Sequence, residues 1–215
     1  MSRLVYLHGF ASGPLSTKAQ YFRARFAEQG HDLAIPELAP DFTNMTITSQ
    51  LAIVRPLLDG DGSVLLGSSL GGYLAALLAA REPARVRALV LIAPAFDFAR
   101  RWQAEVGPDA MRRWRARGTA PVMHYGRARE EQLAIGLLDD AATYPAEPDP
   151  ACPALVLTGS RDEAVPVAVV QRFAAGRPER ELVVYDSDHQ LTDVTPLMWE
   201  RTRRFLVGLR LLETP

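Results

Sequence analysis

Residues 64–72 read Val64-Leu65-Leu66-Gly67-Ser68-Ser69-Leu70-Gly71-Gly72, an apolar run that leads directly into a glycine-rich turn. Residues 67–71 fit the pattern G-x-S-x-G, in which a serine lies on a sharp turn between a strand and a helix. The apolar run predicts the strand, and the small apolar residues 71–80 predict a helix buried against a sheet. Such a turn exposes the Ser69 hydroxyl beside the N–H groups that begin the helix, so Ser69 is our candidate nucleophile.

Short apolar runs alternate with longer helical patterns along most of the chain. This alternation predicts an α/β fold, with a mostly parallel central sheet and helices on both of its faces. The runs are rich in Val and Leu and show little polar alternation, as expected for strands that are buried on both faces. The predicted strands are 4–7, 33–35, 64–66, 88–92, 154–157 and 181–185.

Two further helices have recognisable ends. A Thr17/Gln20 pair resembles a capping box and predicts a helix that runs to about residue 29. Lys18 falls in the first turn of this helix, where we expect a surface residue. Thr195-Pro196 predicts the start of a C-terminal helix, with its core face marked by apolar residues three and four apart.

Segment 96–144 breaks the alternation, because it has no clear strand. It contains Trp102 and Trp114, and eight Arg against four acidic residues fall between positions 97 and 130. We expect one α/β domain over 1–215, with a helical, cap-like insertion at about 96–144. The tryptophans either wall an apolar substrate pocket or only pack the insertion onto the body. The positive charge either steers an anionic substrate or, more simply, is a solvated helix face.

Composition excludes several classes of protein. The chain has 215 residues, a net charge of −1 and one cysteine. This charge balance argues against a protein that mainly binds nucleic acid or an anionic membrane. No apolar run approaches the ~20 residues of a membrane span, and the four apolar residues near the N-terminus are too few for a signal peptide. We therefore expect a cytoplasmic protein, either monomer or dimer.

A serine nucleophile needs a base, and His189 is the candidate. It follows the last predicted strand, where a loop at the carboxyl edge of the sheet can bring it over Ser69. The candidate acid is Asp162, which follows the strand at 154–157 and reaches the same edge, so that it can orient the imidazole. Three other carboxylates compete for that role: Glu163, Asp186 and Asp188.

An oxyanion hole requires two backbone donors near the nucleophile. The N–H of Leu70, which follows Ser69, is the first candidate. The N–H of Phe10 in the loop after the first strand is the second, with Ala11 as its alternative. The Phe10 side chain is also a pocket candidate, together with Trp102 and Trp114. We expect His8 to brace this loop rather than to transfer protons.

Several motifs together resemble the α/β-hydrolase superfamily. They are Leu7-His8-Gly9-Phe10, the stretch 67–73, Ala93-Pro94-Ala95, the stretch 158–163 and Asp188-His189. The opening at 6–12, with Ser16-Thr17-Lys18-Ala19 after it, is similar to the compact bacterial esterases of the YqiA type. The resemblance implies a carboxylic ester hydrolase with Ser69, Asp162 and His189 at the catalytic positions.

The residues and the resemblance thus lead to one expected reaction, the transfer of a short or medium acyl group from a small-molecule ester to water. The expected mechanism needs no metal and no cofactor. A thioesterase, an acyltransferase or a perhydrolase would use the same residues. From a different class, a binder of apolar ligands on a hydrolase scaffold would leave the three side chains apart.

Overall fold

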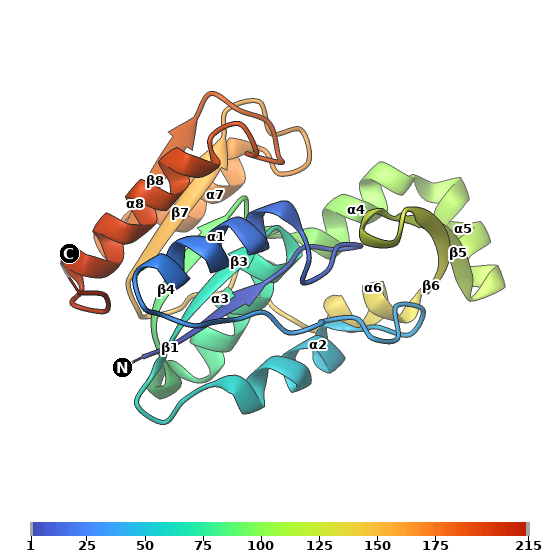
Figure 1. The fold of residues 1–215 in the computed structure, drawn as a ribbon. Helices are drawn as coiled ribbons and strands as arrows, with labels where there is room; N and C mark the ends of the chain where they lie inside the picture. Colours follow the sequence, from blue (N-terminus) through green and yellow to red (C-terminus); the bar gives the residue numbers. More distant parts are fainter. Residues whose placement is uncertain (1, 214–215) are drawn as a thin grey trace.

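A computed structural model describes residues 2–213 (Figure 1). Its main sheet has six strands in the order β2-β1-β3-β4-β7-β8, and every neighbouring pair is parallel. All six predicted strands are present, each within two residues of its predicted ends. The α/β prediction is therefore confirmed. The strands are β1 (Arg3–Leu7), β2 (Leu33–Ala34), β3 (Ser63–Ser68), β4 (Val86–Ile92), β7 (Ala154–Gly159) and β8 (Arg180–Tyr185).

Helices cover both faces of this sheet. One core packs α1 and α8 against one face, and a second packs α2, α3 and α7 against the other. Neighbouring residues of a strand enter different cores: on β1, Tyr6 belongs to the first and Val5 to the second. The covering helices are α1 (Thr17–Glu28), α2 (Ile47–Val54), α3 (Leu70–Arg81), α7 (Val167–Ala174) and α8 (Thr195–Gly208), and short 3-10 turns lie at Arg55–Leu57 and Pro83–Arg85.

Helix α3 has the burial that its sequence predicts. Ten of its residues, from Leu70 to Ala79, are buried. The other two predicted helices begin slightly differently from our expectation. Ser16 is the N-cap of α1 and makes no side-chain capping bond, and Val194 is the N-cap of α8. The expected capping box at Thr17 is therefore wrong, although the helix itself is present.

The chain between β4 and β7 lies at one end of the sheet, remote from both termini (Figure 1). Our expectation that 96–144 has no strand is wrong, because β5 and β6 form an antiparallel hairpin there. Helices α4 and α5 precede the hairpin and α6 follows it. We call this region the cap segment: α4 (Phe98–Val106), α5 (Pro108–Arg117), β5 (Thr119–His124), a 3-10 turn (Tyr125–Arg127), β6 (Arg129–Ala134) and α6 (Gly136–Ala141).

Candidate active site

Ser69 lies at the turn between β3 and α3, at the carboxyl edge of the sheet. Its backbone has φ 52° and ψ −117°, a conformation that non-glycine residues rarely adopt. Two backbone hydrogen bonds hold it there: the Ser69 N–H donates to the Ile92 carbonyl at 2.9 Å, and the Ser69 carbonyl accepts from the Ala95 N–H at 3.0 Å. The strain is therefore balanced by bonds to the last residue of β4 and to the chain that follows it.

The glycines of the motif allow this turn to pack against the first strand. A Cβ on Gly71 would lie 2.6 Å from the His8 carbonyl oxygen and closer still to that of Leu7. A Cβ on Gly67 would lie 2.7 Å from the Cα of Gly72. Both distances are below any normal contact, so only glycine permits the approach of strand, helix and neighbouring loop.

His189 contacts Ser69 with one ring nitrogen and Asp162 with the other. Its Nε2 lies 3.1 Å from Ser69 Oγ, and its Nδ1 lies 2.8 Å from Asp162 Oδ2. The Asp162 side chain has no exposed surface, whereas that of His189 is 21% exposed. The other Asp162 oxygen, Oδ1, accepts a hydrogen bond from the Val165 N–H at 2.6 Å. The structure thus brings together the three residues that we predicted from their order along the chain.

The three competing carboxylates lie elsewhere. Asp186 forms an ion pair with Arg161 at the surface, and Glu163 is exposed. Asp188 Oδ1 accepts from the N–H groups of Gln190 and Leu191, at 2.8 and 3.2 Å. This Asp188 contact shapes the loop that carries the histidine.

A glycine also brings the two loops together. A Cβ on Gly159, at the end of β7, would lie 2.5 Å from the carbonyl oxygen of Asp188. The Arg161 N–H donates to the Ser187 carbonyl at 3.0 Å. The loop with Asp162 and the loop with His189 therefore lie in direct backbone contact.

Lys18 contacts the histidine loop, which our sequence interpretation missed. It is the only lysine among the 24 basic residues, and we expected it at the surface. Its side chain is only half-buried, and its Nζ donates to the carbonyl of Gln190, the residue after His189. Burial lowers the pKa of Lys18 to about 8, although the nearby charges of Asp188 and Asp162 act in the opposite direction. The rarity of lysine in this sequence was the available signal.

The loop after β1 runs beside Ser69. A Cβ on Gly9 would lie 3.5 Å from the Cβ of Ser69. The next two residues, Phe10 and Ala11, therefore follow a position that lies directly beside Ser69. His8 braces the loop, as its Nε2 accepts from the Leu38 N–H at 3.1 Å and its Nδ1 lies 3.0 Å from the Gly9 carbonyl. Its burial lowers its pKa, which favours the neutral ring that these two bonds require.

Leu70 is the first residue of α3. Its N–H is therefore among the groups at a helix start that have no carbonyl partner within the helix. This geometry makes the Leu70 N–H available to an oxygen that develops negative charge at Ser69.

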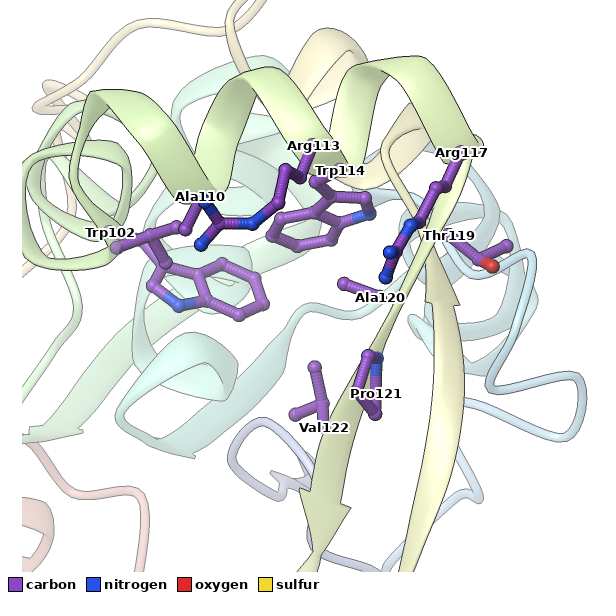
Figure 2. Close-up of a pocket in the computed structure, with 10 residues that line it drawn as sticks. Trp102, Ala110, Arg113, Trp114, Arg117, Thr119, Ala120, Pro121 and Val122 are labelled. Atoms are coloured by element: carbon purple, nitrogen blue, oxygen red, sulfur yellow. The ribbon is translucent and has the colours of Figure 1, made fainter.

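The three pocket candidates form a row of aromatic rings. The Phe10 and Trp102 rings meet edge to face with their centroids 4.8 Å apart, and the Trp102 and Trp114 rings do so at 5.4 Å. Trp114 is only 4% exposed, and its Nε1 donates to the Leu133 carbonyl on β6 at 3.0 Å. Trp114 therefore packs the cap segment, and it also lines a surface pocket together with Trp102 (Figure 2).

Residues 2–213 lack two features of other protein classes. No helix in this range is long and apolar enough to cross a bilayer. Across the same residues, no three His, Cys, Asp or Glu side chains gather into a group that could hold a metal ion.

Several solved structures share this fold. Alpha/beta hydrolase domain-containing protein 10 from mouse is 21% identical, with a TM-score of 0.79 over 96% of this chain and 90% of that one. Est1E from Butyrivibrio proteoclasticus, solved with ferulic acid bound, is 19% identical, with a TM-score of 0.80 over 97% of this chain and 89% of that one. A structure reported for the metagenome-derived lipolytic enzymes LipS and LipT is 22% identical, with a TM-score of 0.72 over 96% and 94%.

At these identities the likeness establishes the α/β-hydrolase fold. The family comparison is more specific, because the sequence model of the uncharacterised protein family UPF0227 matches residues 3–205, nearly the whole chain. The predicted resemblance to YqiA-type proteins is thereby confirmed: the chain belongs to the YqiA-like family UPF0227 and has the α/β-hydrolase fold.

Proposed function

We propose that this protein is a serine hydrolase that cleaves carboxylic esters through a covalent acyl-enzyme. The observation that carries the proposal is the position of His189, with Nε2 3.1 Å from Ser69 Oγ and Nδ1 2.8 Å from Asp162 Oδ2. A hydroxyl is a weak nucleophile unless a base removes its proton as it attacks, and this contact provides that base.

In the first step, Ser69 Oγ attacks the ester carbonyl while His189 Nε2 takes its proton. The buried Asp162 carboxylate accepts the Nδ1–H of His189, keeps Nε2 free as the base, and stabilises the imidazolium that forms. The carbonyl oxygen becomes an oxyanion, which the N–H groups of Leu70 and Phe10 stabilise, with Ala11 as the alternative to Phe10. One such donor contributes about 10²–10³ in rate.

The second step regenerates the enzyme. His189 gives its proton to the leaving alcohol as the tetrahedral intermediate collapses, which leaves the acyl group on Ser69. A water molecule then loses a proton to His189 and attacks the acyl carbonyl. Collapse of the second intermediate returns the proton to Ser69 and releases the acid.

Short or medium acyl groups are the proposed substrates. The pocket that Trp102 and Trp114 line has a volume of about 360 Å³, near the lower end of the 300–1,000 Å³ range of small-molecule sites, and it adjoins the loop beside Ser69 through the contact of Trp102 with Phe10. Among the structures of the same fold, one belongs to the lipolytic enzymes LipS and LipT, and another is Est1E with ferulic acid bound. These names support an ester as the substrate.

The test is hydrolysis of p-nitrophenyl esters, from acetate to palmitate, by wild type and by Ser69→Ala. We expect the variant to lose on the order of 10⁴-fold or more in kcat. Ser49→Ala, in the capping box of α2, is the matched control for a lost hydroxyl and keeps wild-type kcat. Equal activity of wild type and Ser69→Ala would contradict the proposal.

Labelling with a fluorophosphonate tests the nucleophile without an ester substrate. Covalent labelling that Ser69→Ala abolishes supports an activated serine, even where every p-nitrophenyl ester is a poor substrate; thioesters and peracid formation in hydrogen peroxide are then assayed. If wild type is neither labelled nor active, the protein is a binder on a hydrolase scaffold.

A further inference from the structure

A pocket lies in the cap segment, between helices α4 and α5 and strand β5 (Figure 2). Most of its wall is apolar. Trp102 and Val106 of α4 face it, as do Trp114 of α5 and Val122 of β5. A wall of this kind takes an apolar or aromatic group out of water.

Two arginines interrupt this apolar wall. Arg113 and Arg117 line the pocket. Figure 2 shows both side chains extending from α5, that of Arg113 beside Trp114 and that of Arg117 toward Ala120. They are four residues apart on one helix, so their charges lie on the same face and repel each other. Within residues 2–213, neither makes a side-chain hydrogen bond or an ion pair.

Other arginines of the same helix are paired. Arg112 forms an ion pair with Asp109, and Arg115 Nη1 lies 2.9 Å from Oδ1 of Asp139 on α6. The two unpaired positive charges of α5 are therefore the two that face the apolar pocket. An anion with an apolar body would complement both features, because guanidinium groups bind carboxylates through paired hydrogen bonds.

Trp102, which lines the pocket, also packs against Phe10 in the loop beside Ser69. The Trp102 ring lies between those of Phe10 and Trp114, at centroid distances of 4.8 and 5.4 Å. Phe10 follows Gly9, which lies against Ser69. A molecule that reaches from Ser69 to the arginines would have to lie along the rings of Phe10 and Trp102.

From this arrangement we propose a substrate class that rests on the proposed function: esters that carry a carboxylate remote from the scissile bond, joined to it by an apolar chain or an aromatic ring. The ester lies at Ser69, the body lies along Trp102 and Trp114, and the carboxylate binds Arg113 and Arg117. Since these arginines lie away from the reacting atoms, they stabilise bound substrate and transition state alike. Their contribution falls mainly on KM.

The test compares two substrates with the same acyl chain. One is the mono-4-nitrophenyl ester of suberic acid, and the other is the same compound with its remote carboxylate converted to a methyl ester, which removes the charge. For wild type we expect kcat/KM to be higher for the charged ester. In Arg113→Gln/Arg117→Gln, which removes two exposed charges, this preference falls about tenfold, mainly through KM; a tenfold change corresponds to about 1.4 kcal/mol.

Arg112→Gln/Arg115→Gln is the matched control, because it removes the same charge from the same helix. It keeps the wild-type preference if the two pocket arginines bind the carboxylate directly. If both double variants lose the preference equally, the effect is long-range attraction and the proposal is wrong. An unchanged preference in Arg113→Gln/Arg117→Gln would also overturn it.

A binding measurement separates this proposal from the proposed function. 4-Phenylbutyrate is titrated into Ser69→Ala protein, and tryptophan fluorescence is followed, since two of the three tryptophans line the pocket. Saturable binding that the Arg113/Arg117 substitutions abolish supports the anion site even if no ester is hydrolysed. No saturable change would overturn the site, whatever the esterase assays show.

Discussion

Replacing Lys18 with Met should change how the stability of the protein depends on pH. Lys18 is half-buried, and its Nζ donates to the Gln190 carbonyl. Burial lowers its pKa from 10.5 to about 8. Between these two values the unfolded chain binds a proton at Lys18 that the folded chain does not. The free energy of unfolding of the wild type therefore rises with pH across this window.

The size of the effect follows from the shift. One pKa unit corresponds to about 1.4 kcal/mol, so a shift from 10.5 to about 8 amounts to about 3 kcal/mol. This part of the free energy of unfolding is fully present above pH 10.5, where Lys18 is neutral in both states, and is lost as the pH falls through about 8. Lys18→Met removes the titrating group. The unfolding free energy of wild type minus that of Lys18→Met should thus rise by about 3 kcal/mol between pH 7 and pH 10.5.

Urea unfolding, followed by tryptophan fluorescence at half-unit pH steps, measures this difference. Lys18→Arg is the matched control, because arginine keeps its charge throughout the range. Wild type minus Lys18→Arg should show the same rise, and the two variants should differ from each other by a constant. The tyrosines with raised pKa values are the same in all three proteins, so their effect on the differences in unfolding free energy cancels. A wild-type minus Lys18→Met difference that stays flat from pH 7 to 10.5 would refute the burial of this ammonium group.

Two further predictions concern the loops around His189. Asp162→Asn should lower kcat on p-nitrophenyl esters by about 10³–10⁴, because the amide no longer holds the tautomer of the His189 ring. Asp186→Asn, which changes a surface ion pair, is the control and should have little effect on kcat. Comparable losses of kcat in both variants would refute the assignment of Asp162 as the acid. Gly159→Ala should lower kcat and destabilise the fold by about 1–3 kcal/mol, because its Cβ would lie 2.5 Å from the Asp188 carbonyl oxygen. Gly136→Ala, where the new Cβ meets open space, is its control in the same urea and ester assays, and equal stabilities of the two variants would contradict the argument.

Local patterns in the sequence were sufficient for the sheet and for the order of the candidate site. Buried parallel strands need continuous apolar runs, so their positions follow from short windows of sequence. The turn at Ser69 needs small residues at fixed spacing, since the backbones of β1, β3 and α3 approach closely there. Parallel strands also end at one edge, which explains why Ser69 and His189, 120 residues apart, were predicted to meet.

The hairpin of β5 and β6 depended on contacts that no local pattern reveals. β6 begins with Arg129, Glu130 and Glu131, and β5 contains Pro121, so neither looks like a strand. A two-stranded sheet leaves one side of each strand without a partner, and a proline is tolerated on such an edge. Pairing with each other and the packing of Leu133 hold the two segments.

What the sequence by itself determined is therefore the α/β fold, the six strands and the residue types of the candidate site. Only the tertiary structure decided which of four carboxylates contacts His189, because their side-chain directions depend on how two separate loops pack at Gly159. It also decided that the half-buried Lys18 contacts the histidine loop and that Arg113 and Arg117 face a pocket without acidic partners. These properties depend on neighbours remote in the chain, and burial and pairing by such neighbours set the energy of a charge.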